Sequence, residues 1–204
     1  MLLDADDSQL VLVDYQARLL PAIHENALVL ANAMRLARLA RLMEVPTWGT
    51  EENPAKLGEN PPELRALCRK TLAKMHFSAV ADGLTELLRP PVRQQQGGNA
   101  RSLPRHLQKA QQQPQAGEGR NTVVIAGCEA HVCLLQTSLD LLDEEFDVWV
   151  VTDACSSQSE RNRDAAFDRL AAAGAELVTT EMVAFEWLRT ADHPVFGEAL
   201  SLIK

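Results

Sequence analysis

Short apolar runs alternate with segments whose apolar residues recur every three or four positions, and this alternation restricts the fold more than any other feature. The runs predict strands within residues 9–16, 45–54, the first part of 72–88, 121–130, 146–155 and 175–181. The periodic segments predict helices over residues 26–44, the second part of 72–88, about 131–145, 163–174 and the C-terminal tail. Because each return to a parallel strand needs a crossover, we expect an α/β fold with a parallel, Rossmann-like central sheet flanked by helices.

The length and composition fit a single domain over residues 1–204. Hydrophobic residues make up 46% of the 204, enough to bury a core. No run reaches the roughly 18 apolar residues of a membrane span, and the start MLLDADDSQ lacks the basic region of a signal peptide. We therefore expect a cytoplasmic protein that does not interact with a membrane. Four cysteines without a CxxC pair indicate reduced thiols rather than disulfides or a zinc site.

The formal net charge of −8 is unevenly distributed. Residues 89–120 contain six Lys/Arg, a single acid and eight glutamines, so the rest of the chain is strongly acidic. An acidic body argues against nucleic-acid binding, which needs basic faces, and favours a small-molecule substrate. We expect 89–120 to be a basic, Gln- and Pro-rich surface insert. The alternative is a basic arm that docks on an acidic face, such as that of a neighbouring subunit.

The carboxyl ends of the predicted strands are the expected place for a functional site, because loops and helix N-termini gather there in a parallel sheet. Six reactive or charged side chains lie at or just past these ends and could meet: Asp14, Glu51, Lys74, Glu129, Cys133 and Asp153.

Cys133 is the strongest candidate nucleophile among the four cysteines. It lies about two residues into a helix that follows a strand, where unpaired N–H groups and the helix dipole favour a thiolate, so its position predicts a lowered thiol pKa. The same N–H groups could receive an oxyanion. A buried structural cysteine is nevertheless the more common outcome at such a position.

Two charged residues could serve this thiol. Asp14 ends the apolar run VLVD, where its carboxylate could act as a base or cap a loop. Lys74 stands in an otherwise apolar stretch, and a partly buried lysine requires an anionic partner. His131 is two residues from Cys133, which points the two side chains to different faces of one helix, so we expect it to line a pocket rather than form a dyad. The five histidines show no metal-ligand spacing.

Three segments in order, VLVDYQ, KMHFSAV and VVIAGCEAHVC, closely resemble signature segments of the isochorismatase-like cysteine hydrolases. The likeness continues through DHPVFGEALSLIK and covers nearly the whole chain apart from the 89–120 insert. TEENPAKLG is similar to the TEQxPxxLG segment of the isochorismatase-domain branch. The resemblance implies a three-layer α/β sandwich around a parallel sheet.

The resemblance also implies the roles of individual residues. The catalytic triad would be Asp14, Lys74 and Cys133, the oxyanion would be received by the backbone N–H groups of Glu129 and Cys133, and the Cys128–Glu129 peptide bond would be cis. Five residues beside these segments are expected to line the substrate pocket: Gln16, Thr50, Asn53, Phe77 and His131.

Two departures from the family's patterns narrow the expected reaction. The nicotinamidases carry a DxH metal motif that the stretch TEENPAKLGENPPEL lacks, so we expect neither metal nor other cofactor. True isochorismatases lack the cysteine, so Cys133 favours attack on a carbonyl or nitrile-like carbon. We therefore expect a homo-oligomeric hydrolase, dimeric or higher, that cleaves a C–N bond of a small molecule through a thioester.

Four other interpretations stay open at this point. The chain could be a catalytically silent scaffold, a protein that binds a small ligand in the same pocket, a protein with a peroxide-sensitive thiol, or a vinyl-ether hydrolase of the isochorismate type. A Cys133 that reacts with iodoacetamide no faster than Cys68 would favour the scaffold or the binding protein.

Overall fold

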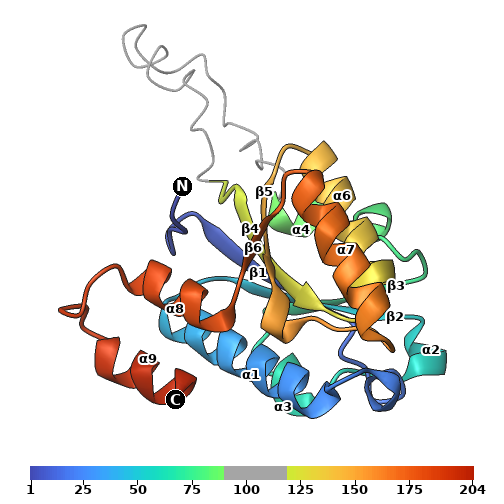
Figure 1. The fold of residues 1–204 in the computed structure, drawn as a ribbon, viewed down its shortest axis with the longest axis horizontal. Coiled ribbons are helices and arrows are strands. Elements are labelled where there is room, and N and C mark those ends of the chain that lie inside the picture. The colour runs from blue at the N-terminus through green and yellow to red at the C-terminus, as the bar shows by residue number, and fades with distance from the viewer. Residues whose placement is uncertain (90–118) are drawn as a thin grey trace, which may run out of the picture.

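Residues 1–89 and 119–204 are described by a computed structural model (Figure 1). The predicted insert at 89–120 therefore falls almost entirely outside the described residues. Its two described ends are held against the body. Arg89 donates to the carbonyls of Glu144 and Glu145 and lies 3.7 Å from the centre of the Phe146 ring, and Arg120 donates to the carbonyl of Ser8 at 2.8 Å.

Six strands form one parallel sheet in the order β3-β2-β1-β4-β5-β6. Strand order reverses between β1 and β4, because the chain builds outward from β1 to β3 and then returns to start β4 on the other side of β1. This reversal point is where open α/β sheets place their ligands. The strands are β1 (Ser8–Val13), β2 (Thr47–Glu52), β3 (Lys70–Lys74), β4 (Thr122–Gly127), β5 (Asp147–Val151) and β6 (Glu176–Val178).

Helices cover both faces of the sheet, which confirms the predicted α/β class and its three layers (Figure 1). One layer consists of α1 (Asn26–Leu42), α8 (Thr180–Leu188) and α9 (Phe196–Ile203), which contact one another. The other consists of α4 (Leu84–Leu88), α6 (Leu135–Asp143) and α7 (Glu160–Ala172). The described residues also contain short elements: η1 (Leu20–Ala22), α2 (Pro54–Leu57), α3 (Pro62–Arg65), η2 (Val80–Asp82), the π-turn η4 (Ala130–Leu134) and η5 (Thr152–Ala154).

The two central strands form the middle of the core, since every residue of β1 and β4 is buried. Their carboxyl ends lie very close together at Gly127, which pairs with Val13. A Cβ at Gly127 would lie 2.3 Å from the Val13 carbonyl oxygen and 2.5 Å from the Val13 Cβ. Glycine is therefore required sterically at the point where β4 leaves the sheet.

Several element boundaries differ from the sequence-based expectation. The second part of 72–88 forms only η2 and the short α4, because Gly83 adopts a left-handed conformation (φ 97°) between them. The helix predicted over 131–145 begins with the π-turn η4 at Ala130, which places Cys133 fourth rather than third in the element. No helix in the described ranges 1–89 and 119–204 is long and apolar enough to cross a membrane.

Candidate active site

Asp14 follows β1 directly and is fixed by the neighbouring strand. Its backbone is left-handed (φ 54°), and its N–H donates to the Thr50 carbonyl at 3.2 Å. The Thr50 hydroxyl donates to Asp14 Oδ1 at 2.7 Å, and both residues are fully buried. Thr50, which we expected to line the substrate pocket, therefore orients the carboxylate of Asp14.

Lys74 is the last residue of β3 and directs its ammonium group back toward β1 and β2. Its Nζ lies 2.8 Å from Asp14 Oδ2 and 2.8 Å from Glu52 Oε2. It also donates to the carbonyls of His76 at 3.3 Å and Phe77 at 3.2 Å. Both carboxylate oxygens of Asp14 are therefore engaged, Oδ1 by the Thr50 hydroxyl and Oδ2 by the Lys74 ammonium.

Glu52 is a member of this cluster that sequence reasoning missed. We named Glu51 as the acid at the end of this strand, but successive residues of a strand face opposite sides. Thr50 and Glu52 share the face that meets Asp14 and Lys74, and the register pairs Glu52 with Lys74. Glu51 instead accepts the N–H of Asn60 at 2.8 Å.

Cys133 reaches the same point from the other side of the β1–β4 reversal. The cis peptide bond Cys128–Glu129 lies where the resemblance implied, in the turn between β4 and η4. Within that turn, the carbonyl of Glu129 accepts the N–H groups of Val132 at 3.1 Å and Leu134 at 3.3 Å. The N–H of Glu129 itself has no acceptor among the described residues.

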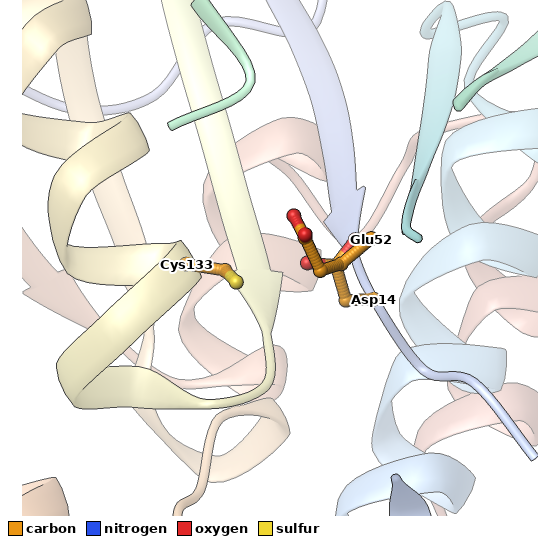
Figure 2. Close-up of side chains that lie close together, drawn as sticks. All are labelled: Asp14, Glu52 and Cys133. Atoms are coloured by element: carbon orange, nitrogen blue, oxygen red, sulfur yellow. The ribbon is translucent and has the colours of Figure 1, made fainter. Parts of the chain in front are cut away.

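The thiol and the two carboxylates converge, as Figure 2 shows: the Cys133 side chain points from its helix toward Asp14 and Glu52 at the ends of adjacent strands. One ligand-type atom from each lies within 4.8 Å of the others. Asp14 and Lys74 side chains are fully buried, whereas Glu52 keeps 12% and Cys133 5% of its surface exposed. Solvent therefore meets the cluster at Cys133 and Glu52.

Burial dominates the electrostatics of the thiol. It raises the pKa of Cys133 to about 12, with the charge of Asp14 adding to the rise and that of Lys74 opposing it. This is opposite in direction to the lowered pKa that we expected from a helix N-terminus. Burial by itself would lower the pKa of Lys74, but attraction to Asp14 and the bonds to Asp14 and Glu52 raise it. The resting cluster is a neutral thiol beside a permanently charged ammonium.

Four of the five residues predicted to line the pocket touch the cluster through structural contacts. Asn53 donates its N–H to the Lys74 carbonyl at 2.8 Å, and Phe77, half exposed, supplies a carbonyl to Nζ. Gln16 is fully buried and bonds to the backbone of Glu52, and Thr50 bonds to Asp14 as described. His131 instead contacts the Ser157 hydroxyl at 2.9 Å, away from the thiol.

The remaining strand-end acids serve local structure. Asp153 accepts the N–H of Thr180 at 2.8 Å at the start of α8, and Glu129 accepts the N–H of Gln158 at 3.0 Å. The other cysteines lie in the core or in a half-buried position, and burial raises their thiol pKa values, that of Cys68 to about 11 and that of Cys128 to about 12.

Asp14, Glu52 and Cys133 have the spacing of a group that could hold a metal ion. The ammonium of Lys74, however, lies 2.8 Å from both carboxylates and already occupies the place where a cation would bind them. Two carboxylates and a thiol around a fixed ammonium form an acid–base and nucleophile cluster more readily than a metal centre.

Comparison with known proteins is consistent with this fold. The family model for the isochorismatase domain matches residues 8–182. Isochorismatase domain-containing protein 2 of Rattus norvegicus is 34% identical over 199 residues, which are 98% of this chain and 82% of the rat protein.

Solved structures agree over nearly the whole chain. The MAR1 ribonuclease from Caenorhabditis elegans has a TM-score of 0.78 at 29% identity, over 100% of this chain and 92% of that one. YcaC from Escherichia coli, described as an octameric hydrolase of unknown specificity, gives 0.78 at 28%, over 100% and 89%. YcaC from Pseudomonas aeruginosa, bound to hexane-2,5-diol and covalent acrylamide, gives 0.77 at 28%, over 98% and 91%. The protein thus belongs to the isochorismatase domain family.

Proposed function

We propose that this protein is a cysteine hydrolase that cleaves a C–N bond, in an amide or a related carbonyl compound, of a small molecule. The observation that carries the proposal is the convergence of a thiol, a carboxylate and a fixed ammonium at the strand-order reversal. These are the parts of an activated nucleophile: a weak nucleophile, a base within reach and a third group that orients the base.

In the proposed reaction Asp14 accepts the thiol proton as Cys133 Sγ attacks the carbonyl carbon. The tetrahedral intermediate collapses to a thioester, and the departing nitrogen takes the proton from Asp14. A water molecule then attacks the thioester while Asp14 takes its proton, and the released sulfur regains that proton from Asp14. Because the resting thiol is neutral, proton transfer accompanies the attack instead of preceding it.

The oxyanion of each tetrahedral intermediate would be received by the backbone N–H groups of Glu129 and Cys133. The N–H of Glu129 has no acceptor in the described part of the chain, which supports this assignment. A preorganised N–H pair of this kind contributes about 3–4 kcal/mol per donor to stabilising an acyl-transfer transition state.

Two other reactions are less compatible with the cluster. Vinyl-ether hydrolysis needs an acid and makes no use of the thiol. The ribonuclease named among the structural neighbours would act on a phosphodiester, but Asp14, Glu52 and Lys74 together carry a net charge of −1 that would repel phosphate. A silent scaffold or a ligand-binding protein remains the alternative that experiment must separate from an enzyme.

The direct test is to incubate the protein with small amides, ureas and nitriles and to detect an acyl adduct by intact mass. We expect an adduct on Cys133 in wild-type protein quenched with acid during turnover, and neither adduct nor product in the Asp14→Asn variant, which lacks the base for both steps. Cys68→Ser, which changes a half-buried cysteine outside the cluster, is the matched control for Cys133→Ser. Equal turnover in the Cys133→Ser variant and the wild type would disprove the proposal.

We further propose that the protein is a homo-oligomer. Met75 and Phe77 directly follow the catalytic lysine and are 65% and 52% exposed, an unusual position for two large apolar side chains. A neighbouring subunit that covers them would also shield the site from water, and one structural neighbour is described as octameric. Light scattering on the wild type and on a Met75→Glu/Phe77→Glu variant tests this: we expect dissociation, and an unchanged mass would contradict this interface.

A further inference from the structure

Glu52 makes the same contact with Lys74 as the proposed base does. Lys74 Nζ lies 2.8 Å from Glu52 Oε2 and 2.8 Å from Asp14 Oδ2, so a single ammonium group is shared between two carboxylates. The family's TEQxPxxLG segment has glutamine at this position, where the chain reads TEENPAKLG. The second carboxylate is therefore not required by the triad itself.

The backbone at Glu52 is held on both sides by one side chain. Gln16 accepts the Glu52 N–H at 2.8 Å and donates to the Glu52 carbonyl at 2.9 Å, and Gln16 is fully buried. The carboxylate therefore reaches Lys74 from a fixed point at the end of β2. Buried polar groups that satisfy each other in this way specify one geometry.

The charge of Glu52 acts within a short range of the thiol. One Glu52 carboxylate oxygen, one of Asp14 and the Cys133 sulfur lie within 4.8 Å of one another. The ionisable groups around Lys74 are Asp14 from β1, Glu52 from β2 and Cys133 from η4, and Cys128 faces Asp14 from the end of β4. With the thiol protonated, the cluster has two negative charges and one positive charge.

We propose that Glu52 is a positioning residue that divides the Lys74 ammonium between two carboxylates and holds the proton on Cys133 until Asp14 removes it. This inference rests on the proposed function, since it assigns Asp14 as the base. Without Glu52 the whole ammonium charge would pair with Asp14, which would make Asp14 a weaker base. Loss of the Glu52 carboxylate would also remove a negative charge near Cys133, and that charge opposes thiolate formation. The free thiol would become more acidic while turnover became slower.

Two substitutions separate the charge of Glu52 from its shape. Glu52→Gln keeps the shape and the backbone contacts but removes the charge, and Glu52→Asp keeps the charge but shortens the side chain. A charge role predicts that Glu52→Gln differs from the wild type and Glu52→Asp resembles it. A role in packing alone predicts the reverse. Glu51→Gln is the matched control, because it removes an equal charge from the adjacent buried residue on the opposite face of β2.

The first measurement is the rate of Cys133 alkylation by acrylamide at pH 8, with the modified peptide identified by mass. Removing a nearby negative charge favours the thiolate, and a fall of one pKa unit raises the thiolate fraction about tenfold, so Glu52→Gln should be alkylated about tenfold faster. Glu51→Gln and Glu52→Asp should stay within about threefold of the wild type, a change of under half a pKa unit. If a substrate is found, its kcat/KM should fall in Glu52→Gln although the thiol reacts faster.

The second measurement needs no reactive thiol: titration of Lys74, followed by the NMR shift of its Cε carbon in labelled protein. The Lys74 pKa should be lower in Glu52→Gln than in the wild type and retained in Glu52→Asp. Turnover of a substrate that survives Cys133→Ser would contradict the proposed function, and the Lys74 titration alone would then decide the role of Glu52. Glu52→Gln behaving like Glu51→Gln in both measurements would overturn the inference.

Discussion

Replacement of Lys74 by methionine tests whether its ammonium stabilises the fold as well as the site. The change removes the positive charge that lies 2.8 Å from two carboxylates, one of them fully buried, and leaves two negative charges facing each other. Removing one partner from a buried ion pair costs about 3–5 kcal/mol, because the remaining charge is left uncompensated. For a chain of this size that loss corresponds to a fall in Tm of roughly 6–20 °C.

The assay is urea unfolding followed by circular dichroism at pH 8 and pH 5, at one protein concentration for all variants. The pKa of Lys74 is raised by its partners, so its stabilising contribution is fully present below its ordinary value of about 10.4 and is lost only above that pH. Lys74 itself therefore stays charged across the pH 5 to 8 window. A smaller penalty at pH 5 in the variant would arise from protonation of one of the two unpaired carboxylates.

Lys70→Met is the matched control, since Lys70 begins the same strand but is exposed. We expect that variant to unfold within about 0.5 kcal/mol of the wild type. A contrary result would be a free energy of unfolding that falls in Lys74→Met by less than about 1 kcal/mol at pH 8, or by no more than in Lys70→Met. Either result would show that the ammonium is not the counter-ion of two buried carboxylates.

Three further predictions follow from the geometry. The rate of Cys133 alkylation by acrylamide should rise about tenfold per pH unit from pH 7 to 9 without a plateau. Burial raises the pKa of Cys133 to about 12, and the thiolate fraction grows tenfold per pH unit below the pKa. A plateau near pH 6 to 7 would instead show a preformed thiolate. Thr50→Val should lower the free energy of unfolding in urea by about 1.5–3 kcal/mol, because it removes a buried hydrogen bond to a carboxylate. An unchanged urea midpoint would argue against that hydrogen bond. Gly127→Ala should lower the free energy of unfolding by about 3 kcal/mol or more, because the added Cβ overpacks the end of β4. Gly197→Ala is the control: an added Cβ there has open space, so Tm should be nearly unchanged or slightly higher.

The fold could be predicted from the sequence because it depends on local patterns, and the resemblance to the isochorismatase-like hydrolases then singled out three of the six candidate residues at the strand ends. Apolar runs mark the buried strands, and Asp14, Lys74 and Cys133 all lie at or just beyond the ends of strands. The choice between Glu51 and Glu52 could not be predicted so simply, because both end the same strand and only register with β3 decides which faces Lys74. The strict alternation of strand side chains, applied from Thr50, would have favoured Glu52.

The pKa of Cys133 was expected to be lowered, whereas burial raises it, and the reason is related. The position of a residue near a helix start can be read from the sequence, but its burial and the approach of a carboxylate from a strand 119 residues earlier cannot. The helix boundary also differed, because η4 opens as a π-turn that no residue pattern in 128–134 announces. Long-range contacts decide both features.

The anchors at Arg89 and Arg120 have a practical consequence for engineering this protein. Both bind backbone groups at the amino-terminal edge of the sheet, next to the starts of β5 and β1, whereas the cluster of Asp14, Glu52, Lys74 and Cys133 lies past the carboxyl ends. Strands of five or six residues separate these edges by roughly 17–20 Å. An affinity tag or a fluorescent protein inserted between the two arginines would therefore be attached at the edge of the sheet opposite the candidate active site. The protein could then be immobilised or tracked without a change to the geometry of that site.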